Sequence, residues 1–237
     1  MPKADAGVAA LTQAIQGALG NNLVCLATYG SAAGDDWIEG RSNLNLAVVV
    51  HTVTLDVLER LAPILRQHQA LRLALPLVVD PGYLAQARDT FPMELDDLRR
   101  QHRVLAGTDV FRDLTTEPAA IRRECEREAR GKLLRLRAHF LAVTDDPHGL
   151  EQLMLESLKS YLFVLRHYVR LRQGDGPQAF AAVVAAAERL LGPLPTLRQL
   201  LEHRQVRPHD ASRLRQDFAA YLGEVERIVT AIDQLDV

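Results

Sequence analysis

LVCLATYGSAAGDDWIEGRSNLNLAVVV, residues 23–50, is the stretch of sequence that decides the fold. It holds two short apolar runs, LVCLATY and LNLAVVV, of the kind that forms buried strands. Gly30 and Ser31 follow the first run and offer a glycine and a small hydroxyl where a backbone turn can approach a phosphate. The stretch therefore predicts a strand, a tight turn, a polar loop and a second strand.

The composition is that of an ordinary globular protein. Of 237 residues, 48% are apolar and 24% are charged, and the net charge is −2. Such a charge gives no global basic field that would favour a nucleic acid as partner. No apolar run reaches the ~18 residues of a membrane span, and the N-terminus lacks the long apolar core of a signal peptide. We expect a cytoplasmic protein without a membrane partner.

The first half of the chain alternates strand and helix patterns, which indicates an α/β layer. Apolar residues at helical spacing predict a helix that ends at Leu19 and another that begins near Thr54. The segment FPMELD, residues 91–96, alternates apolar and acidic residues, which is typical of an edge strand or a strand that lines a site. The expected strands are residues 23–29, 43–50, 73–79 and 91–96.

The second half shows helical periodicity without a convincing strand. Proline and glycine clusters separate its segments, as in DDPHG and GPLP. Two long helices, one of medium length and a long last one favour a four-helix bundle, with a short helical turn before the last. The helices are expected at residues 118–143, 150–172, 179–191, 197–203 and 212–235, with the domain boundary near Asp113.

The Gly-Ser turn between two strands resembles the nucleotidyltransferase fold of DNA polymerase beta, kanamycin nucleotidyltransferase and the small MNT proteins. Arg41 and Ser42 lead into the second strand as they do in that superfamily. The resemblance implies an α+β protein: a small mixed-sheet nucleotidyltransferase-like domain over residues 1–113, then an all-α four-helix-bundle domain over residues 114–237. It also implies that a nucleoside triphosphate lies against Gly30, Ser31, Arg41, Ser42, Asn43 and Asn45.

The departure from the family falls on the metal ligands. The resemblance places two aspartates, at i and i+2 on the second strand, where they hold Mg²⁺; this chain has Asn43 and Asn45 there. An asparagine oxygen can bind Mg²⁺, but the site loses two formal negative charges. We therefore expect the metal site to be degenerate and nucleotidyl transfer to be impaired.

A third carboxylate is expected from a neighbouring strand. Glu94 and Asp96 are the candidates, because alternation in a strand places both on one face; solvated edge residues are the alternative. Acidic residues of the polar loop offer another source of ligands, namely Asp35, Asp36 and Glu39.

The helical half resembles the bundle of aminoglycoside nucleotidyltransferases and, more loosely, the HEPN domains that pair with MNT proteins. HEPN ribonucleases use an arginine followed four to six residues later by a histidine; two such pairs occur here, Arg198…His203 and Arg204…His209. The arginines near the start of this half, from Arg123 to Arg137, alternate with glutamates and predict a solvated face with internal ion pairs.

Three functions follow from these patterns. The first is a nucleotidyltransferase-like pseudoenzyme that binds a nucleotide or a protein partner. The second is an active enzyme that transfers a nucleoside monophosphate to a small hydroxyl substrate, such as an aminoglycoside, or to a protein. The third is a HEPN-type toxin fused to its MNT-type antitoxin. The resemblance also implies a homodimer.

Overall fold

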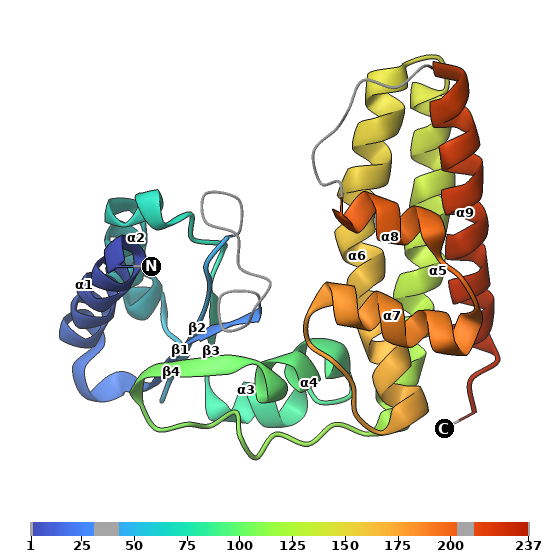
Figure 1. Cartoon of the computed structure of the whole chain (residues 1–237). Helices are drawn as coiled ribbons and strands as arrows, with labels where there is room; N and C mark the ends of the chain where they lie inside the picture. Colours follow the sequence, from blue (N-terminus) through green and yellow to red (C-terminus); the bar gives the residue numbers. More distant parts are fainter. Residues whose placement is uncertain (1, 31–42, 203–210, 237) are drawn as a thin grey trace. The chain divides into compact units, whose positions relative to one another are not determined.

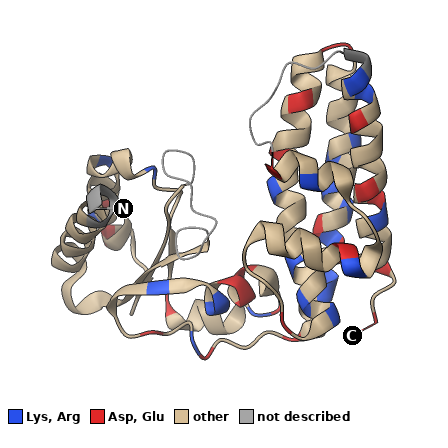
Figure 2. Ribbon diagram, in the orientation of Figure 1, with Lys and Arg blue, Asp and Glu red and all other residues tan. Residues whose placement is uncertain are grey.

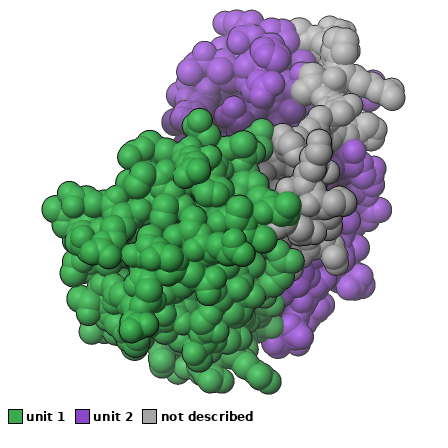
Figure 3. All heavy atoms as spheres, turned by 90° about the vertical axis from the view of Figure 1, so that its left-hand side faces the viewer, with its two compact units in different colours: residues 1–117 green, residues 118–237 purple. Residues whose placement is uncertain are grey.

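A computed structural model describes residues 2–30, 43–202 and 211–236 of the chain. Its contacts divide the chain into two compact units, residues 1–117 and 118–237 (Figures 1 and 3). The first unit carries the sheet and the second is helical, so the expected α+β class is confirmed. A boundary between independent domains at Asp113 stays a prediction.

The sheet of the first unit has four strands in the order β3-β2-β1-β4. The central strand β1 runs antiparallel to both neighbours, β2 and β4, whereas β2 and β3 are parallel, so the sheet is mixed. The strands are β1 (Leu23–Tyr29), β2 (Asn45–Val50), β3 (Leu77–Val79) and β4 (His102–Gly107).

Helices cover both faces of this sheet, which explains why β1 and β2 are apolar at almost every position. Leu26, Leu46 and Val48 pack on one face with α1 (Pro2–Leu19) and α2 (Leu55–Gln67). Cys25, Ala27, Ala47 and Val49 pack on the other face with α3 (Pro81–Gln86) and α4 (Pro92–Arg100).

Two helices of this unit begin at side-chain caps that the sequence signals. Thr54 Oγ1 accepts a hydrogen bond from the Val57 N–H at 3.3 Å and starts α2, as predicted. Asp80 Oδ1 accepts from the Tyr83 N–H at 2.8 Å, and Pro81 occupies the first turn of α3. The Asp-Pro-Gly sequence is therefore both a turn and the start of a short helix.

The predicted strand over residues 91–96 is wrong, because these residues begin α4. Pro92 lies in the first turn, where its missing N–H costs nothing. Leu95 and Leu98, three residues apart, bury one side of the helix against the sheet. The alternation of residues 91–96 is thus compatible with a helix whose apolar side continues past the predicted strand.

Strand β1 has the predicted bounds, residues 23–29, whereas β2 begins at Asn45 and not at residue 43. The predicted strand over residues 73–79 is reduced to Leu77–Val79, preceded by an isolated bridge between Leu73 and Leu44. Pro76 interrupts the segment because it lacks an N–H for the ladder. Strand β4 was not predicted from the sequence.

Among the residues that the structure describes, the second unit contains helices joined by loops and no strand. All five helices were predicted, with bounds that differ by up to three residues. They are α5 (Pro118–Val143), α6 (Pro147–Gln173), α7 (Phe180–Leu191), α8 (Pro195–Glu202) and α9 (Ala211–Asp233). In none of the described helices of the chain is an 18-residue window apolar enough to cross a membrane.

The ends of α5 and α9 are joined by one arginine. Arg122 Nε donates to the Leu235 carbonyl at 2.6 Å, and Arg122 Nη2 donates to the Asp233 carbonyl at 2.8 Å. These carbonyls lie at the C-terminal end of α9, where a helix leaves acceptors without partners of its own. A cation there satisfies the acceptors and opposes the negative end of the helix dipole.

The start of α8 is capped by a carboxylate from α9. Glu224 is buried, and its two oxygens accept from the Thr196 and Leu197 N–H groups, each at 2.8 Å. Glu224→Ala is expected to lower the free energy of unfolding by about 3 kcal/mol, because it removes two charge-assisted hydrogen bonds and leaves buried donors. Urea denaturation of the full chain measures the change.

The matched control is Glu156→Ala, which removes an exposed glutamate from α6. It is expected to change stability by less than about 0.5 kcal/mol, as for most surface substitutions. Equal losses in the two variants would contradict the capping role of Glu224.

Candidate functional site

The candidate site lies where β1 ends and β2 begins. Tyr29, the last residue of β1, pairs with Asn45 of β2 on one side and with His102 of β4 on the other. Residues directly opposite each other in an antiparallel ladder point to the same face of the sheet. Tyr29 packs in the core on the α4 side, so Asn45 lies on that face as well.

Gly30 makes the turn that follows β1. Its φ is +68°, a value that side-chain-bearing residues rarely adopt, and a Cβ added there would lie 2.9 Å from Asn45 Nδ2. Its N–H donates to the Gln101 carbonyl at 3.1 Å. The Gly30 N–H is therefore already engaged, and a phosphate at this turn has to be held by other donors.

Several predicted site residues lie outside the described part of the chain. These are Ser31, Arg41 and Ser42 of the expected phosphate site and Asp35, Asp36 and Glu39 of the loop.

Asn43 and Asn45 flank a buried leucine at the start of β2. Leu44 donates its N–H to the Arg72 carbonyl and accepts from the Ala74 N–H, both at 3.0 Å, so the chain is extended here. Asn43 is exposed, Leu44 buried and Asn45 half-buried. This alternation places the two asparagines on the face opposite Leu44.

Glu94 brings a carboxylate to the same end of the sheet. It is exposed in the first turn of α4. Burial raises the pKa of the Tyr29 hydroxyl, and the negative charge of Glu94 raises that pKa further. Glu94 therefore acts electrostatically on the strand end that also carries Asn45.

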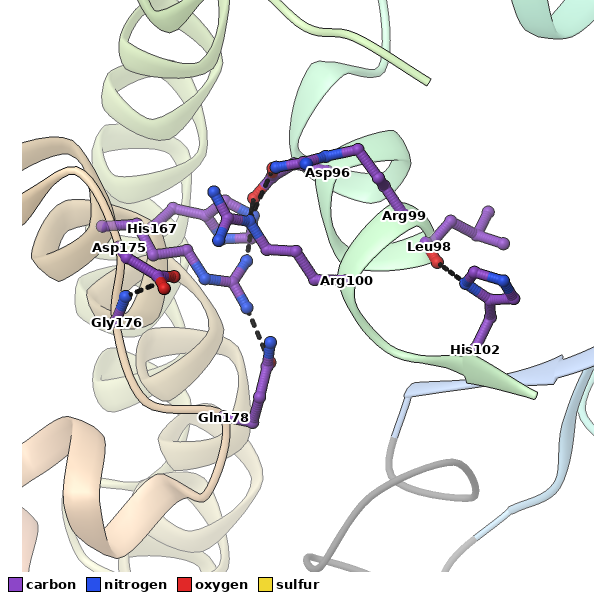
Figure 4. Close-up of polar contacts among 10 residues, drawn as sticks. Asp96, Leu98, Arg99, Arg100, His102, His167, Asp175, Gly176 and Gln178 are labelled. Carbon is purple, nitrogen blue, oxygen red and sulfur yellow. Dashed lines mark hydrogen bonds and ion pairs between the residues drawn. The ribbon is translucent and has the colours of Figure 1, made fainter. Parts of the chain in front are cut away.

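Asp96 does not share a face with Glu94, in contrast to the expectation from a strand. Residues two positions apart in an α-helix, such as Glu94 and Asp96, are separated by about 200° around the helix axis. Asp96 is buried, and its two oxygens accept from Arg100 Nε at 2.8 and 2.9 Å (Figure 4). Arg99 Nη2 lies 3.2 Å from the same carboxylate. Both arginines lie on α4 itself, so these contacts stabilise the helix from within.

Sequence reasoning missed a second group of residues that holds β4 beside this turn. The His102 Nδ1–H donates to the Leu98 carbonyl at 2.7 Å, and His102 Nε2 lies 3.1 Å from Asp109 Oδ1. Burial acts to raise the pKa of Asp109, but hydrogen bonds from His102 and from the Phe111 and Arg112 N–H groups outweigh it and lower the pKa. The one sequence signal for this group was Asp109, a residue type that favours turns.

Gln101 is a missed residue that contacts Gly30 of the expected phosphate site. Its backbone carbonyl receives the Gly30 N–H, and its side chain is buried. Among the described residues its Oε1 has no hydrogen-bond partner. Nothing in the sequence distinguishes Gln101 from the charged residues around it.

The donors described at this end of the sheet do not fit a two-magnesium centre. Two neutral amides, Asn43 and Asn45, stand at the strand positions, and Glu94 is a described carboxylate whose charge acts on the neighbouring Tyr29. Mg²⁺ pairs in phosphoryl transfer are held by several carboxylates, which offset the charge of the ions. Amide side chains also carry N–H donors, which carboxylates lack.

The HEPN-type pairs gain no support from the described residues. Arg198 forms an ion pair with Glu188, while His203, Arg204 and His209 lie outside the described part of the chain. A different arginine–histidine contact occurs on α6, where Arg170 Nη1 lies 3.4 Å from His167 Nε2 and Arg170 also bonds Gln178 (Figure 4). The ribonuclease function stays a prediction.

The arginines of α5 form the expected ion pairs along the helix. Arg127 pairs with Glu128 at 2.9 Å and Arg130 with Glu126 at 3.0 Å. Both signs of charge occur along the same helices of the second unit (Figure 2). The prediction of a solvated, internally paired face is confirmed for these residues.

Comparison with solved structures identifies the fold. The chain is similar to a spectinomycin adenyltransferase from Enterococcus faecialis that was crystallised with ATP and spectinomycin. The TM-score is 0.56 at 14% identity, over 99% of this chain and 100% of that one. The likeness shows a nucleotidyltransferase-like fold with a helical C-terminal region. No protein-family model and no curated protein sequence matches the chain.

Proposed function

We propose that this chain is a nucleotidyltransferase-like protein that binds a nucleoside triphosphate without carrying out magnesium-dependent nucleotidyl transfer. One observation carries the proposal: amides stand at residues 43 and 45, at the start of β2, beside the turn at Gly30. The fold supports it, because the spectinomycin adenyltransferase of similar fold was crystallised with ATP.

The chemistry of the amides favours a phosphate over a metal ion. A pair of carboxylates repels a triphosphate unless cations lie between them. Asn43 and Asn45 carry no charge, and each side-chain NH₂ offers two donors to phosphate oxygens. A nucleotide that binds here therefore does not need Mg²⁺ to offset repulsion from the protein.

Isothermal titration of the full chain with ATP and GTP tests this proposal. We expect a weak dissociation constant, about 0.1–1 mM, which corresponds to roughly −5 kcal/mol. Removing Mg²⁺ with EDTA is expected to change this dissociation constant by less than about threefold, because the neutral amides do not repel the triphosphate. A threefold change corresponds to less than about 1 kcal/mol. A parallel assay is expected to detect no pyrophosphate release.

A glycine substitution at the turn provides the specificity control. Gly30→Ala is expected to abolish binding because of the left-handed φ and the nearby Asn45 amide. Gly17→Ala, on α1 where an added Cβ meets nothing within 4 Å, is expected to leave binding unchanged. Binding that survives Gly30→Ala would place the nucleotide elsewhere.

The second candidate function is an active transferase that acts on a small hydroxyl substrate. Glu94 favours it, because this carboxylate acts on the strand end that carries Asn45. Magnesium-dependent pyrophosphate release with an aminoglycoside, lost in Glu94→Ala, would establish this function and overturn the first. A protein-binding role and a cytoplasmic location are further proposals from the sequence.

A further inference from the structure

A pocket in the second unit is lined by residues of α6, α7 and the C-terminal part of the chain, including α9 (Figure 1). Its volume is about 540 Å³, which lies within the range of small-molecule sites. All of its lining residues belong to the second unit, and none belongs to the candidate nucleotide site. A ligand in this pocket would therefore bind separately from the nucleotide.

Part of the pocket lining is apolar. Leu190 and Leu191 stand at the end of α7, Ala231 lies in the last turn of α9, and Leu235 follows that helix. Leu235 is buried and the other three are half-buried. The hydrocarbon part of a ligand can cover these side chains and remove their surface from water.

Tyr168 and Arg172 bring polar groups to this apolar surface. They lie four residues apart on α6, so they share one side of the helix. Tyr168 is 4% exposed, yet its hydroxyl makes no hydrogen bond with any residue that the structure describes. Burial raises the pKa of this hydroxyl, and the positive charge of Arg172 acts to lower it, as expected for neighbouring groups. Arg172 is exposed and has neither an ion pair nor a hydrogen bond among the described residues.

A second arginine adds positive charge to the pocket. Arg227 Nη2 donates to the Pro193 carbonyl at 2.5 Å, and Nη1 donates to the Leu191 carbonyl at 3.5 Å. Both acceptors are neutral, so they position the guanidinium without cancelling its charge. Glu226 is the one acid among the described lining residues, and its carboxylate already accepts from Arg137 Nη2 at 2.7 Å. The pocket therefore combines net positive charge with an apolar surface.

We propose that this pocket binds an organic carboxylate with an apolar hydrocarbon part. The carboxylate accepts hydrogen bonds from the Arg172 guanidinium and the Tyr168 hydroxyl, and the hydrocarbon part covers Leu191 and Ala231. Both polar groups then gain the partner that the described chain does not provide.

The charges of the pocket favour a carboxylate over other head groups. An ammonium group would be repelled by Arg172 and Arg227, and a neutral head group would leave the guanidinium of Arg172 without an anion. A phosphate monoester carries about two negative charges and would bring the second one close to Glu226. A guanidinium presents parallel N–H donors that match the two oxygens of a carboxylate.

Isothermal titration of the full chain with octanoate tests the proposal. We expect saturable binding with a dissociation constant of about 1 mM or lower. Octanol and octylammonium have the same hydrocarbon chain and are expected to bind at least about tenfold more weakly, because they lose the charge-assisted hydrogen bonds. Acetate has the charge without the hydrocarbon chain and is expected to show no saturable binding. ATP is expected not to displace octanoate.

Two substitutions test the roles of the polar groups. Arg172→Gln is expected to weaken octanoate binding about tenfold, and Tyr168→Phe about threefold. Neither group has a partner in the described chain, so the urea midpoint is expected to stay that of the wild type in both variants. The matched control, Arg66→Gln, removes the same charge from an exposed position of α2 in the first unit and is expected to leave octanoate binding unchanged.

Several results would overturn the proposal. The first is the absence of saturable octanoate binding, and the second is equal affinity for octanoate and octanol. Full affinity in Arg172→Gln, or an equal loss in Arg66→Gln, would show that Arg172 does not hold the carboxylate. Tighter binding of octylammonium would assign the pocket to a cation, and displacement of octanoate by ATP would contradict a site separate from that of the nucleotide.

Discussion

Replacing Asn43 and Asn45 together with aspartate is expected to make nucleotide binding depend on magnesium. Without Mg²⁺ the two added charges repel the triphosphate and weaken its binding. With Mg²⁺ the same charges hold the cation, which bridges protein and phosphate. If each aspartate contributes about 1.4 kcal/mol, the ratio of dissociation constants without and with Mg²⁺ rises from near one to about 100. Titration with ATP in EDTA and in MgCl₂ measures this ratio.

A control variant separates the local effect from the change in net charge. Asn21→Asp with Gln69→Glu adds two charges at exposed positions of the first unit. This variant is expected to keep a ratio near one. A ratio that rises equally in both variants would show that the start of β2 has no special relation to the nucleotide. No change in either variant would remove residues 43 and 45 from the binding site.

Gly107→Ala is expected to cause the largest loss of stability of any substitution considered for this chain. Gly107 ends β4 with φ +81°, and an added Cβ would lie 2.1 Å from the Val24 carbonyl oxygen. That oxygen cannot move freely, because it accepts the Thr108 N–H at 2.9 Å. Strain at a left-handed φ and overpacking each cost about 1–3 kcal/mol, so we expect a loss of about 3–5 kcal/mol. Urea denaturation provides the measurement.

Gly17→Ala is the matched control for this backbone effect. Gly17 is exposed in α1, where an added Cβ meets nothing within 4 Å. Alanine there is expected to stabilise the chain by about 0.5–1 kcal/mol, because glycine is a poor helix former. The same sign of change in both variants would contradict the clash at Val24.

The helices of the second unit were predictable because their apolar spacing is helical and proline or glycine marks several of their boundaries. Asp146 caps α6, whose first turn contains Pro147, and Gly174 ends this helix with φ +77°. Strands β1 and β2 were equally clear, since strands buried on both faces read as unbroken apolar runs. In these regions local preference and tertiary packing agree.

The sequence predicted neither α4 as a helix nor β4 as a strand, because both elements depend on tertiary contacts. The alternation at residues 91–96 fits a strand and a helix start equally well over so short a window. β4 begins with His102 and Arg103, which continue the polar character of α4. It becomes a strand by pairing with β1, far away in the sequence.

Only those residues of the candidate site that have a local sequence signal could be named in advance. Gly30, Asn43 and Asn45 could be found because they lie beside apolar strands. Gln101 could not, since its contact with Gly30 exists only once β4 pairs with β1. Placing Asp96 with Glu94 failed because one wrong secondary-structure assignment changes which residues share a face.

The contacts of Arg122 have a consequence for the order in which the chain folds during synthesis. Arg122 enters the growing chain more than a hundred residues before the carbonyls of Asp233 and Leu235 that it binds. The strands of the sheet, in contrast, are all complete by Gly107. We expect the sheet to form while the helical unit is still being translated. The helical unit has to wait for α9, so a ribosome that stalls before residue 211 would release a chain whose sheet is formed and whose bundle is open.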